Sequence, residues 1–235
     1  MMKRIAVTLI LVSFFNLIHA QTTHEQTGWF FFLNSTRINE KWGVHFDLQL
    51  RSHDELDGLR HMLVRPGLTY HIKPNQNATV GYLYTPTFTR SVGTPNTTLT
   101  EHRIWEQYVI SHKLFSGNLG HRFRLEQRFI EKPAGNRVFA QRLRYFLRHV
   151  QPLTNTAGGF TKGPFAALQN EVFANIQNQK NTNNHFFDQN RAYIAAGYRF
   201  SKKVDVEAGY MNIFGKGANA NTVNNVAQLA VYTRF

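Results

Sequence analysis

The stretch Trp42–Arg51, WGVHFDLQLR, alternates between large apolar residues and small or polar ones over ten positions. The even-numbered positions hold Trp, Val, Phe, Leu and Leu, while the odd-numbered ones hold Gly, His, Asp, Gln and Arg. Successive side chains of a β-strand point to opposite faces, so this alternation predicts a long strand with one apolar and one polar face.

The same period of two recurs along the chain. Clear repeats lie at 119–129, 139–148, 191–200 and 204–210, and weaker ones at 28–37, 60–72, 78–88, 101–114, 164–175 and 225–235. About eleven strands are therefore expected, most of them close to the 9–11 residues that a tilted strand needs to cross a bilayer. The 20 Phe and 9 Tyr residues also favour a β-rich fold, because aromatic rings suit half-buried pleated surfaces.

The segments between these strands alternate in length. Short turns are expected at Ile38–Lys41, Lys73–Asn77, Phe115–Asn118 and Ser201–Lys203. Longer loops are expected at Ser52–Leu59, Thr89–Thr100, Glu131–Arg137, Ile176–Phe186 and Ile213–Asn224. Outer-membrane barrels show this asymmetry, with short periplasmic turns and longer outside loops. The segment Gln151–Gly163 departs from the rule, because it is long and Gly-rich in a short-turn position.

Alternation by itself does not say which face is inside. A soluble barrel buries the apolar face, whereas a membrane barrel turns it toward lipid. Three features favour the membrane barrel: repeated Arg on the polar face, aromatic residues near strand ends, and a final strand that stops on Phe235. We therefore predict an all-β, antiparallel transmembrane β-barrel of about 10–12 strands, with a secreted β-sandwich as the alternative.

The expected number of strands is not settled, because the alternation indicates about eleven, which is an odd number. Bacterial single-chain barrels normally have an even number of strands. Either residues 42–235 close a ten-stranded barrel and 28–37 lie in or against it, or a further strand near 151–163 makes twelve.

The first twenty residues have the layout of a secretory signal peptide. A basic start that includes Lys3 and Arg4 precedes the apolar run Ile5–Ile18, and Ala20 offers a small residue at the cut. The run is shorter than the roughly 20 residues of a transmembrane helix. We expect a signal peptide at 1–20, a single barrel domain at 21–235, and a location in the bacterial outer membrane.

Composition excludes several classes of protein. The chain has no Cys, so disulfide scaffolds, zinc fingers, iron–sulfur clusters and thiol catalysis are ruled out. The formal charge is +13, but it is spread along the whole chain, and with export this argues against a nucleic-acid partner. No cofactor and no metal site are predicted. The three acids of His53–Asp57 lack the spacing of a calcium loop and are expected to be solvated.

Six short motifs indicate a family. In chain order they are Leu63–Leu68 (LVRPGL), Glu101–Trp105 (EHRIW), Leu125–Phe129 (LEQRF), Arg142–Tyr145 (RLRY), Asp188–Arg191 (DQNR) and Gly209–Asn212 (GYMN). Together they resemble the family catalogued as domain of unknown function 2490, over nearly the whole mature chain. The resemblance implies an exported bacterial protein and an outer-membrane barrel. It implies no activity and no catalytic residues.

The face assignments predict a basic lumen. Thirteen basic residues are expected to point inward: Arg51, Arg65, Arg103, Lys113, Arg122, Arg124, Arg128, Arg142, Arg144, Arg148, Arg191, Arg199 and Arg234. Six acidic residues are expected beside them: Asp47, Glu101, Glu126, Glu171, Asp205 and Glu207.

Two interpretations of this face remain open. In the first, the lumen is filled by Arg–carboxylate pairs, with Glu126, Glu101 and Glu171 as partners, since the Arg fork pairs well with carboxylates. In the second, the excess positive charge binds or conducts small anions, because like charges in a confined space repel unless anions accompany them. The hypothetical anion ladder consists of Arg122, Arg124, Arg128, Arg142, Arg144 and Arg148.

No catalytic constellation is identified, and no enzyme is predicted. Ser111 and His112 are neighbours on a strand, so their side chains point to opposite faces. A lipid-modifying barrel enzyme, which would use a lipid-facing histidine such as His102, His112 or His121, is kept as an alternative. A second alternative is a sealed barrel whose Asn-rich loops at 176–186 and 213–224 bind lipopolysaccharide or a surface partner. The expected partners are the lipid bilayer and the outer-membrane assembly machinery.

Overall fold

The computed structural model describes residues 22–90, 96–154 and 159–235. The predicted signal peptide at 1–20 lies outside the described residues. Within the described ranges the chain is almost entirely β-structure, and the two helices are single 3₁₀ turns at Asp54–Leu56 and Gln179–Asn181. Neither is long and apolar enough to cross a membrane.

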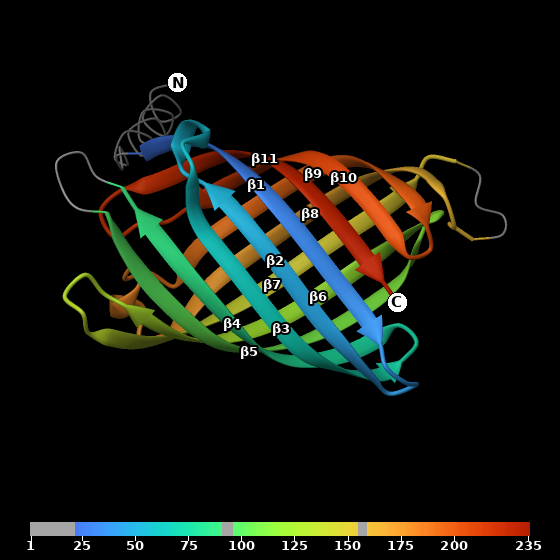
Figure 1. The fold of residues 1–235 in the computed structure, drawn as a ribbon, viewed down its shortest axis with the longest axis horizontal. Coiled ribbons are helices and arrows are strands. Elements are labelled where there is room, and N and C mark those ends of the chain that lie inside the picture. The colour runs from blue at the N-terminus through green and yellow to red at the C-terminus, as the bar shows by residue number, and fades with distance from the viewer. Residues whose placement is uncertain (1–21, 91–95, 155–158) are drawn as a thin grey trace, which may run out of the picture.

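Eleven strands form the wall of the molecule, each overlapping one of the segments predicted from the alternation. They are β1 (Thr22–Arg37), β2 (Trp42–Ser52), β3 (Leu59–Lys73), β4 (Gln76–Thr89), β5 (Thr97–Leu114), β6 (Gly117–Glu131), β7 (Arg137–Pro152), β8 (Gly163–Gln177), β9 (Phe187–Ser201), β10 (Val204–Gly215) and β11 (Asn221–Arg234). Figure 1 shows them as a cylinder of steeply tilted strands. The predicted barrel fold is confirmed.

The barrel closes through a parallel pair of strands. Each strand from β1 to β11 pairs antiparallel with its neighbours in sequence, and the seam between β1 and β11 runs parallel from Thr22↔Asn221 to Ser35↔Arg234. Past the last of these pairs, the backbone N–H of Arg37 donates to the carbonyl oxygen of Phe235 at 2.6 Å. With eleven strands that alternate in direction, the first and the last run in the same direction. The barrel therefore closes by pairing them in parallel (Figure 1).

This closure differs from both alternatives drawn from strand parity. Residues 28–37 belong to β1, which is a full member of the wall rather than a segment lying in or against a ten-stranded barrel. In the part of the chain that the structure describes, β7 ends at Pro152 and β8 begins at Gly163, with no further strand between them. The prediction of an antiparallel barrel therefore needs one correction, at the seam.

The two ends of the barrel carry different connections. One end has short turns, such as those after Arg37 and Ser201, and holds the chain end at Phe235 (Figure 1). The other end has the longer connections β2–β3, β4–β5, β6–β7, β8–β9 and β10–β11, together with the start of β1. Below, these are called the short-turn end and the long-loop end.

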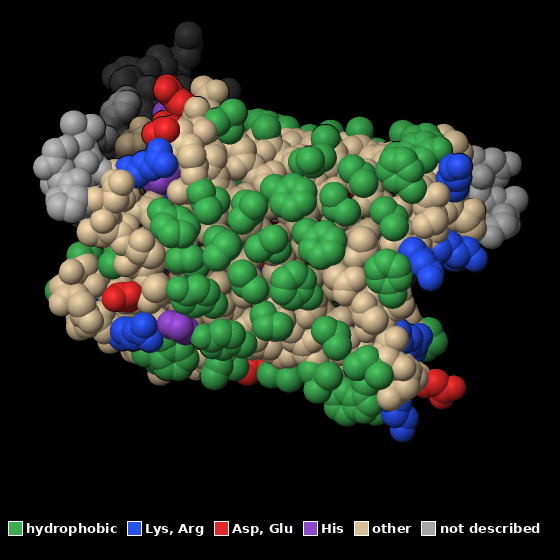
Figure 2. All heavy atoms as spheres, viewed as in Figure 1, with side chains coloured by type: hydrophobic (Ala, Val, Ile, Leu, Met, Phe, Trp, Pro, Cys, Tyr) green, Lys and Arg blue, Asp and Glu red, His purple; other side chains and the backbone are tan. Residues whose placement is uncertain are grey.

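The outer surface of the barrel is apolar. On β2, Trp42 is 42% exposed, whereas Asp47 of the opposite face is 1% exposed, so the apolar face of the alternation points outward. Figure 2 shows hydrophobic side chains over the middle of the wall, with the charged side chains of this view gathered mostly near the two ends. This distribution is inverted relative to a soluble barrel, which buries its apolar face.

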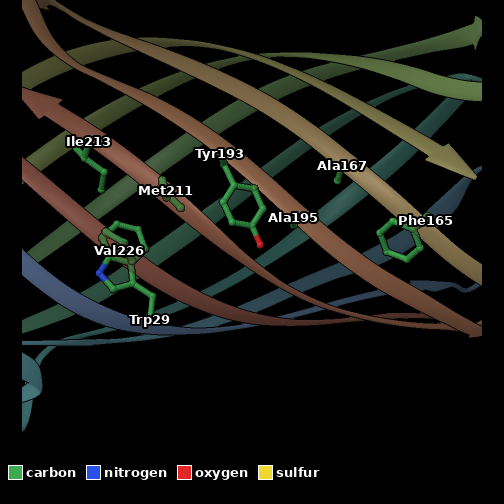
Figure 3. Close-up of a cluster of buried hydrophobic side chains, with 8 residues drawn as sticks. All are labelled: Trp29, Phe165, Ala167, Tyr193, Ala195, Met211, Ile213 and Val226. Atoms are coloured by element: carbon green, nitrogen blue, oxygen red, sulfur yellow. The ribbon is translucent and has the colours of Figure 1, made fainter. Parts of the chain in front are cut away.

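The lumen is not uniformly polar, which the sequence patterns did not indicate. Figure 3 shows a cluster of buried apolar side chains on the side of the barrel formed by β8–β11 and β1. It comprises Trp29, Phe165, Ala167, Tyr193, Ala195, Met211, Ile213 and Val226. A second, smaller cluster of Leu63, Leu83 and Trp105 lies on β3–β5. Between these clusters, the arginine residues of β6 and β7 face the lumen.

Candidate functional site

The adjacent strands β6 and β7 place the six predicted ladder residues on the inner face. Their register sets Arg124 opposite Arg144 and Glu126 opposite Arg142, because inward residues recur at every second position. Arg122 is the next inward residue from Arg124 toward the start of β6, and it lies opposite Phe146. The guanidinium carbon of Arg122 lies 4.2 Å from the centroid of the Phe146 ring. The structure thus brings the predicted ladder together across one hairpin.

Glu126 is the centre of an ion-pair network. Its side chain is 1% exposed, and it accepts hydrogen bonds from Arg142 at 2.7 Å and Arg144 at 2.6 Å. The Nη1 of Arg103 lies 3.5 Å from the same carboxylate. Arg142 also pairs at 2.7 Å with Asp188, an acid that the face assignments did not include. Bidentate and shared contacts of this kind are the strong form of charge-assisted hydrogen bonding.

The other two predicted partners are shared in the same way. Glu171 binds Arg122 and Arg144, each at 2.7 Å. Glu101 binds Arg103 and Arg128, each at 2.6 Å. Further luminal ion pairs include Arg65–Asp47, Arg148–Glu207, Arg199–Asp205 and Arg234–Asp205. All six predicted acids therefore have arginine partners, and five of the six ladder residues are neutralised at least in part.

Apart from the exposed Arg37 at the short-turn end, three luminal arginines have no carboxylate within ion-pair distance among the described residues. They are Arg51, Arg124 and Arg191, and each stacks on an aromatic ring instead. The guanidinium carbons of Arg51 and Arg191 lie 3.8 and 5.2 Å from the centroid of the Trp29 ring. That of Arg124 lies 4.6 Å from the Trp105 ring. Cation–π contacts stabilise a guanidinium but leave its positive charge without a counter-charge.

Arg124 is the most completely enclosed of the three. It is 1% exposed, and its Nε and Nη2 donate to Gln107 Oε1 at 3.2 and 2.6 Å. Its Nη1 has no hydrogen-bond partner among the described residues. A buried cation with a free donor is costly, since burial removes its hydration without supplying a replacement.

Two cavities in the lumen meet at Trp29 and Arg191. A cavity of about 570 Å³ extends to the short-turn end, where Arg37 and Phe235 line it. A smaller one of about 240 Å³ lies toward the long-loop end and is lined by Arg51. Trp29 and Arg191 line both, so these two side chains lie where the cavities meet, and Arg51 stacks on Trp29 from the side of the smaller cavity.

Sequence reasoning missed Trp29 and Trp105, although both organise the site. Trp29 begins the run Trp29–Leu33, WFFFL, which is apolar at every position and so gives no signal of which residues face inward. Trp105 follows an inward Arg103 by two residues, and that spacing was a usable signal for its inward position. The predicted luminal Lys113, in contrast, is exposed near the end of β5.

The histidines considered for catalysis are held by aromatic and histidine neighbours. His102 Nδ1 shares a hydrogen bond with the hydroxyl of Tyr82, and His121 with that of Tyr145. His112 stacks on His121 with ring centroids 5.3 Å apart. Within the described ranges, no group of three His, Asp or Glu residues is arranged to hold a metal ion. Neither the absence of enzyme activity nor that of a cofactor is tested by these contacts, and both stay predictions.

The family follows from a match over most of the chain. A family model described as "Protein of unknown function (DUF2490)" matches residues 26–224, from β1 into β11. The chain belongs to this family. The resemblance predicted from the six motifs is thereby confirmed. The match reaches into every strand of the DUF2490 barrel and covers its luminal arginines except Arg234.

A solved structure supports the fold of this DUF2490 protein. It is a NanC porin in a rhombohedral crystal form, similar with a TM-score of 0.51 over 81% of this chain and 85% of that chain. The sequence identity is 11%, so the likeness concerns the fold alone. No match is found among curated proteins.

Proposed function

We propose that this DUF2490 protein spans the bacterial outer membrane as a β-barrel and binds anions in its lumen. The apolar outer wall supports the location, since outer-membrane barrels turn a hydrophobic band toward lipid and keep a polar interior. Orientation follows the usual asymmetry, with the short-turn end in the periplasm and the long-loop end outside.

The single observation that carries anion binding is the set of carboxylate-free arginines, Arg51, Arg124 and Arg191. The luminal carboxylates are already shared among other arginines, so these three positive charges have no carboxylate within ion-pair distance in the part of the chain that the structure describes. Charges of one sign in a low-dielectric space repel each other strongly, and an anion relieves both the repulsion and the lost hydration. A ring of arginines is also how anion pores obtain selectivity.

Calorimetric titration of inorganic sulfate into the refolded protein in lipid nanodiscs tests this proposal, with empty nanodiscs subtracted. Sulfate is expected to bind the native barrel and to bind at least about tenfold more weakly after Arg124→Gln, because a charge-assisted contact of 1.5 kcal/mol or so is lost. Heat-modifiable gel mobility confirms that each variant is folded. Absence of sulfate binding to a folded native barrel refutes the proposal.

The matched control is Lys113→Gln, which removes one positive charge at the exposed end of β5 rather than in the lumen. Sulfate affinity is expected to stay within about twofold of the native value, since exposed charges are screened by salt. An equal loss for the Lys113 and Arg124 variants attributes binding to net charge and contradicts a luminal site.

Biogenesis partners belong to the same proposal. The final strand β11 ends at Arg234, directly before Phe235, which is 58% exposed, and we infer that the outer-membrane assembly machinery recognises this strand. Lipopolysaccharide stays a proposed partner of the long-loop end.

A further inference from the structure

The 570 Å³ cavity has two unlike walls that face each other. Four strands lie between β1 and β6 in one direction around the barrel, and four lie between β1 and β7 in the other. The arginine hairpin and β1 therefore occupy opposite sides of the lumen. The two walls also differ in chemistry, and this difference restricts the kind of ligand that the cavity can bind.

The wall on β6 and β7 is basic. Arg122, Arg124, Arg144 and Arg148 line the cavity there. Two of them keep buried nitrogens without a hydrogen-bond partner among the described residues, namely Nη1 of Arg124 and Nε of Arg122. An anionic group is the partner that satisfies such donors, because carboxylate, sulfonate and phosphate oxygens accept from guanidinium groups with the best geometry.

The part of the wall that β1 forms with Trp29, Phe31 and Leu33 is apolar, whereas Ser35 and Arg37 of the same strand line the cavity nearer the short-turn end. Trp29, Phe31 and Leu33 line the cavity in succession along the strand, and Met211 of β10 adjoins them. Phe31 is held by an edge contact with Tyr232, with ring centroids 5.7 Å apart. A hydrated inorganic ion gains nothing from these surfaces, whereas a hydrocarbon or aromatic group is stabilised by leaving water for them.

We propose that this cavity binds an amphipathic organic anion. Its charged group contacts Arg124 and Arg122, and its apolar body packs on Trp29, Phe31 and Leu33. The inference rests on the proposed function, since it names the class of anion that the lumen takes. The volume lies within the roughly 300–1,000 Å³ of small-molecule sites. Because Arg37 and Phe235 line the cavity, the ligand enters from the short-turn end.

Three probes test the assignment by calorimetry on the refolded protein in lipid nanodiscs, with empty nanodiscs subtracted. Naphthalene-2-sulfonate carries both the charge and the apolar body, inorganic sulfate carries the charge alone, and naphthalene-2-methanol carries the body alone. The sulfonate is expected to bind at least about tenfold more tightly than either other probe, since only it uses both walls.

Substitutions test separately the contact with the charged group of the ligand and the contact with its apolar body. Arg124→Gln is expected to weaken both sulfonate and sulfate. Leu33→Ser is expected to weaken the sulfonate about tenfold and leave sulfate unchanged, because it removes apolar surface only. Ile213→Ser is the matched control: Ile213 is a buried apolar residue of the same lumen that lines the smaller cavity instead. Its sulfonate affinity should stay within about twofold of the native value.

The outcomes separate this inference from the proposed function. If sulfate binds as tightly as the sulfonate and Leu33→Ser changes neither, the amphipathic ligand is refuted while anion binding stands. If neither anion binds the folded native barrel, both are refuted. If the neutral alcohol binds as tightly as the sulfonate, the amphipathic anion is refuted, and the sulfate titration alone decides anion binding. The comparison of probes uses the native protein, so it decides the question even if a variant does not fold.

Discussion

Arg124 of β6 lies directly opposite Arg144 of β7 in the barrel wall, and both are buried, but only Arg144 has carboxylate partners. Arg144 bridges Glu126 and Glu171, whereas Arg124 binds the neutral amide of Gln107. One arginine of the pair therefore forms structural ion pairs in the lumen, and its neighbour has no carboxylate to neutralise it among the described residues.

This difference predicts unequal effects of two substitutions on the free energy of unfolding. Arg144→Gln removes the cation from two buried carboxylates and should lower the free energy of unfolding by about 3 kcal/mol. Arg124→Gln removes a cation that lacks a counter-charge and should leave the unfolding free energy within about 1 kcal/mol of the native value, or raise it. Urea unfolding in lipid vesicles at low salt measures both. Equal losses for the two variants contradict the distinction.

Trp29 should control the flow of ions through the lumen. Because its ring lies where the two cavities meet, Trp29→Ala is expected to widen the connection between them and to raise the single-channel current about twofold or more. The measurement is planar-bilayer recording across a potassium chloride gradient, with a reversal potential that favours chloride. Trp42→Ala is the control, since Trp42 is an exposed outer-face residue. Unchanged currents in the Trp29 variant place the barrier elsewhere.

Two inward glycines should differ sharply in their tolerance of a methyl group. A Cβ at Gly81 would overlap the Trp105 ring and the carbonyl oxygen of Pro66, whereas one at Gly120 would meet nothing closer than the Arg148 carbonyl oxygen at 3.9 Å. Gly81→Ala should therefore destabilise the barrel by about 1–3 kcal/mol, and Gly120→Ala by less than about 0.5 kcal/mol. Urea midpoints followed by heat-modifiable gel mobility test this, and a tolerant Gly81 argues against the close packing of Trp105.

The membrane band can be located with one strand. Ile194 lies at the middle of β9 and Phe200 near its end, and their side chains are similarly exposed, at 57% and 55%. In a bilayer, Ile194→Arg should cost about 2–4 kcal/mol and Phe200→Arg about 0–1 kcal/mol, because the cost of a charge depends on depth. Unfolding in phosphatidylcholine vesicles measures both. Equal small costs would mean that the outer wall does not face lipid.

The strands were predictable from the sequence because alternation is a local property. Trp42–Arg51 reports its two faces without reference to any other strand, and β2 forms over Trp42–Ser52. Closure is not local: the pairing of β1 with β11 joins residues about two hundred positions apart, and nothing in either segment specifies a parallel partner. The alternation therefore predicts the strand segments, whereas the parallel seam is not predictable from either segment alone.

For the candidate site, the sequence predicts which residues face the lumen but not which of them contact each other. Face assignment gathered Arg122, Arg124 and Arg144 in the lumen, but the choice of which arginine meets which carboxylate depends on register and rotamer across several strands. Trp29 was missed for a different reason, because its run WFFFL has no polar residue to mark a face. Its role emerges only once β1 is placed opposite the arginine hairpin.

The parallel seam has a topographical consequence for the chain ends. With an even number of strands, the start of the first strand and the end of the last strand lie at the same end of the barrel. Here Thr22 lies at the long-loop end and Phe235 at the short-turn end. In the proposed orientation, the beginning of β1 must be carried through the membrane during insertion. An epitope fused before Thr22 would then be displayed on the cell surface, while one fused after Phe235 would stay in the periplasm.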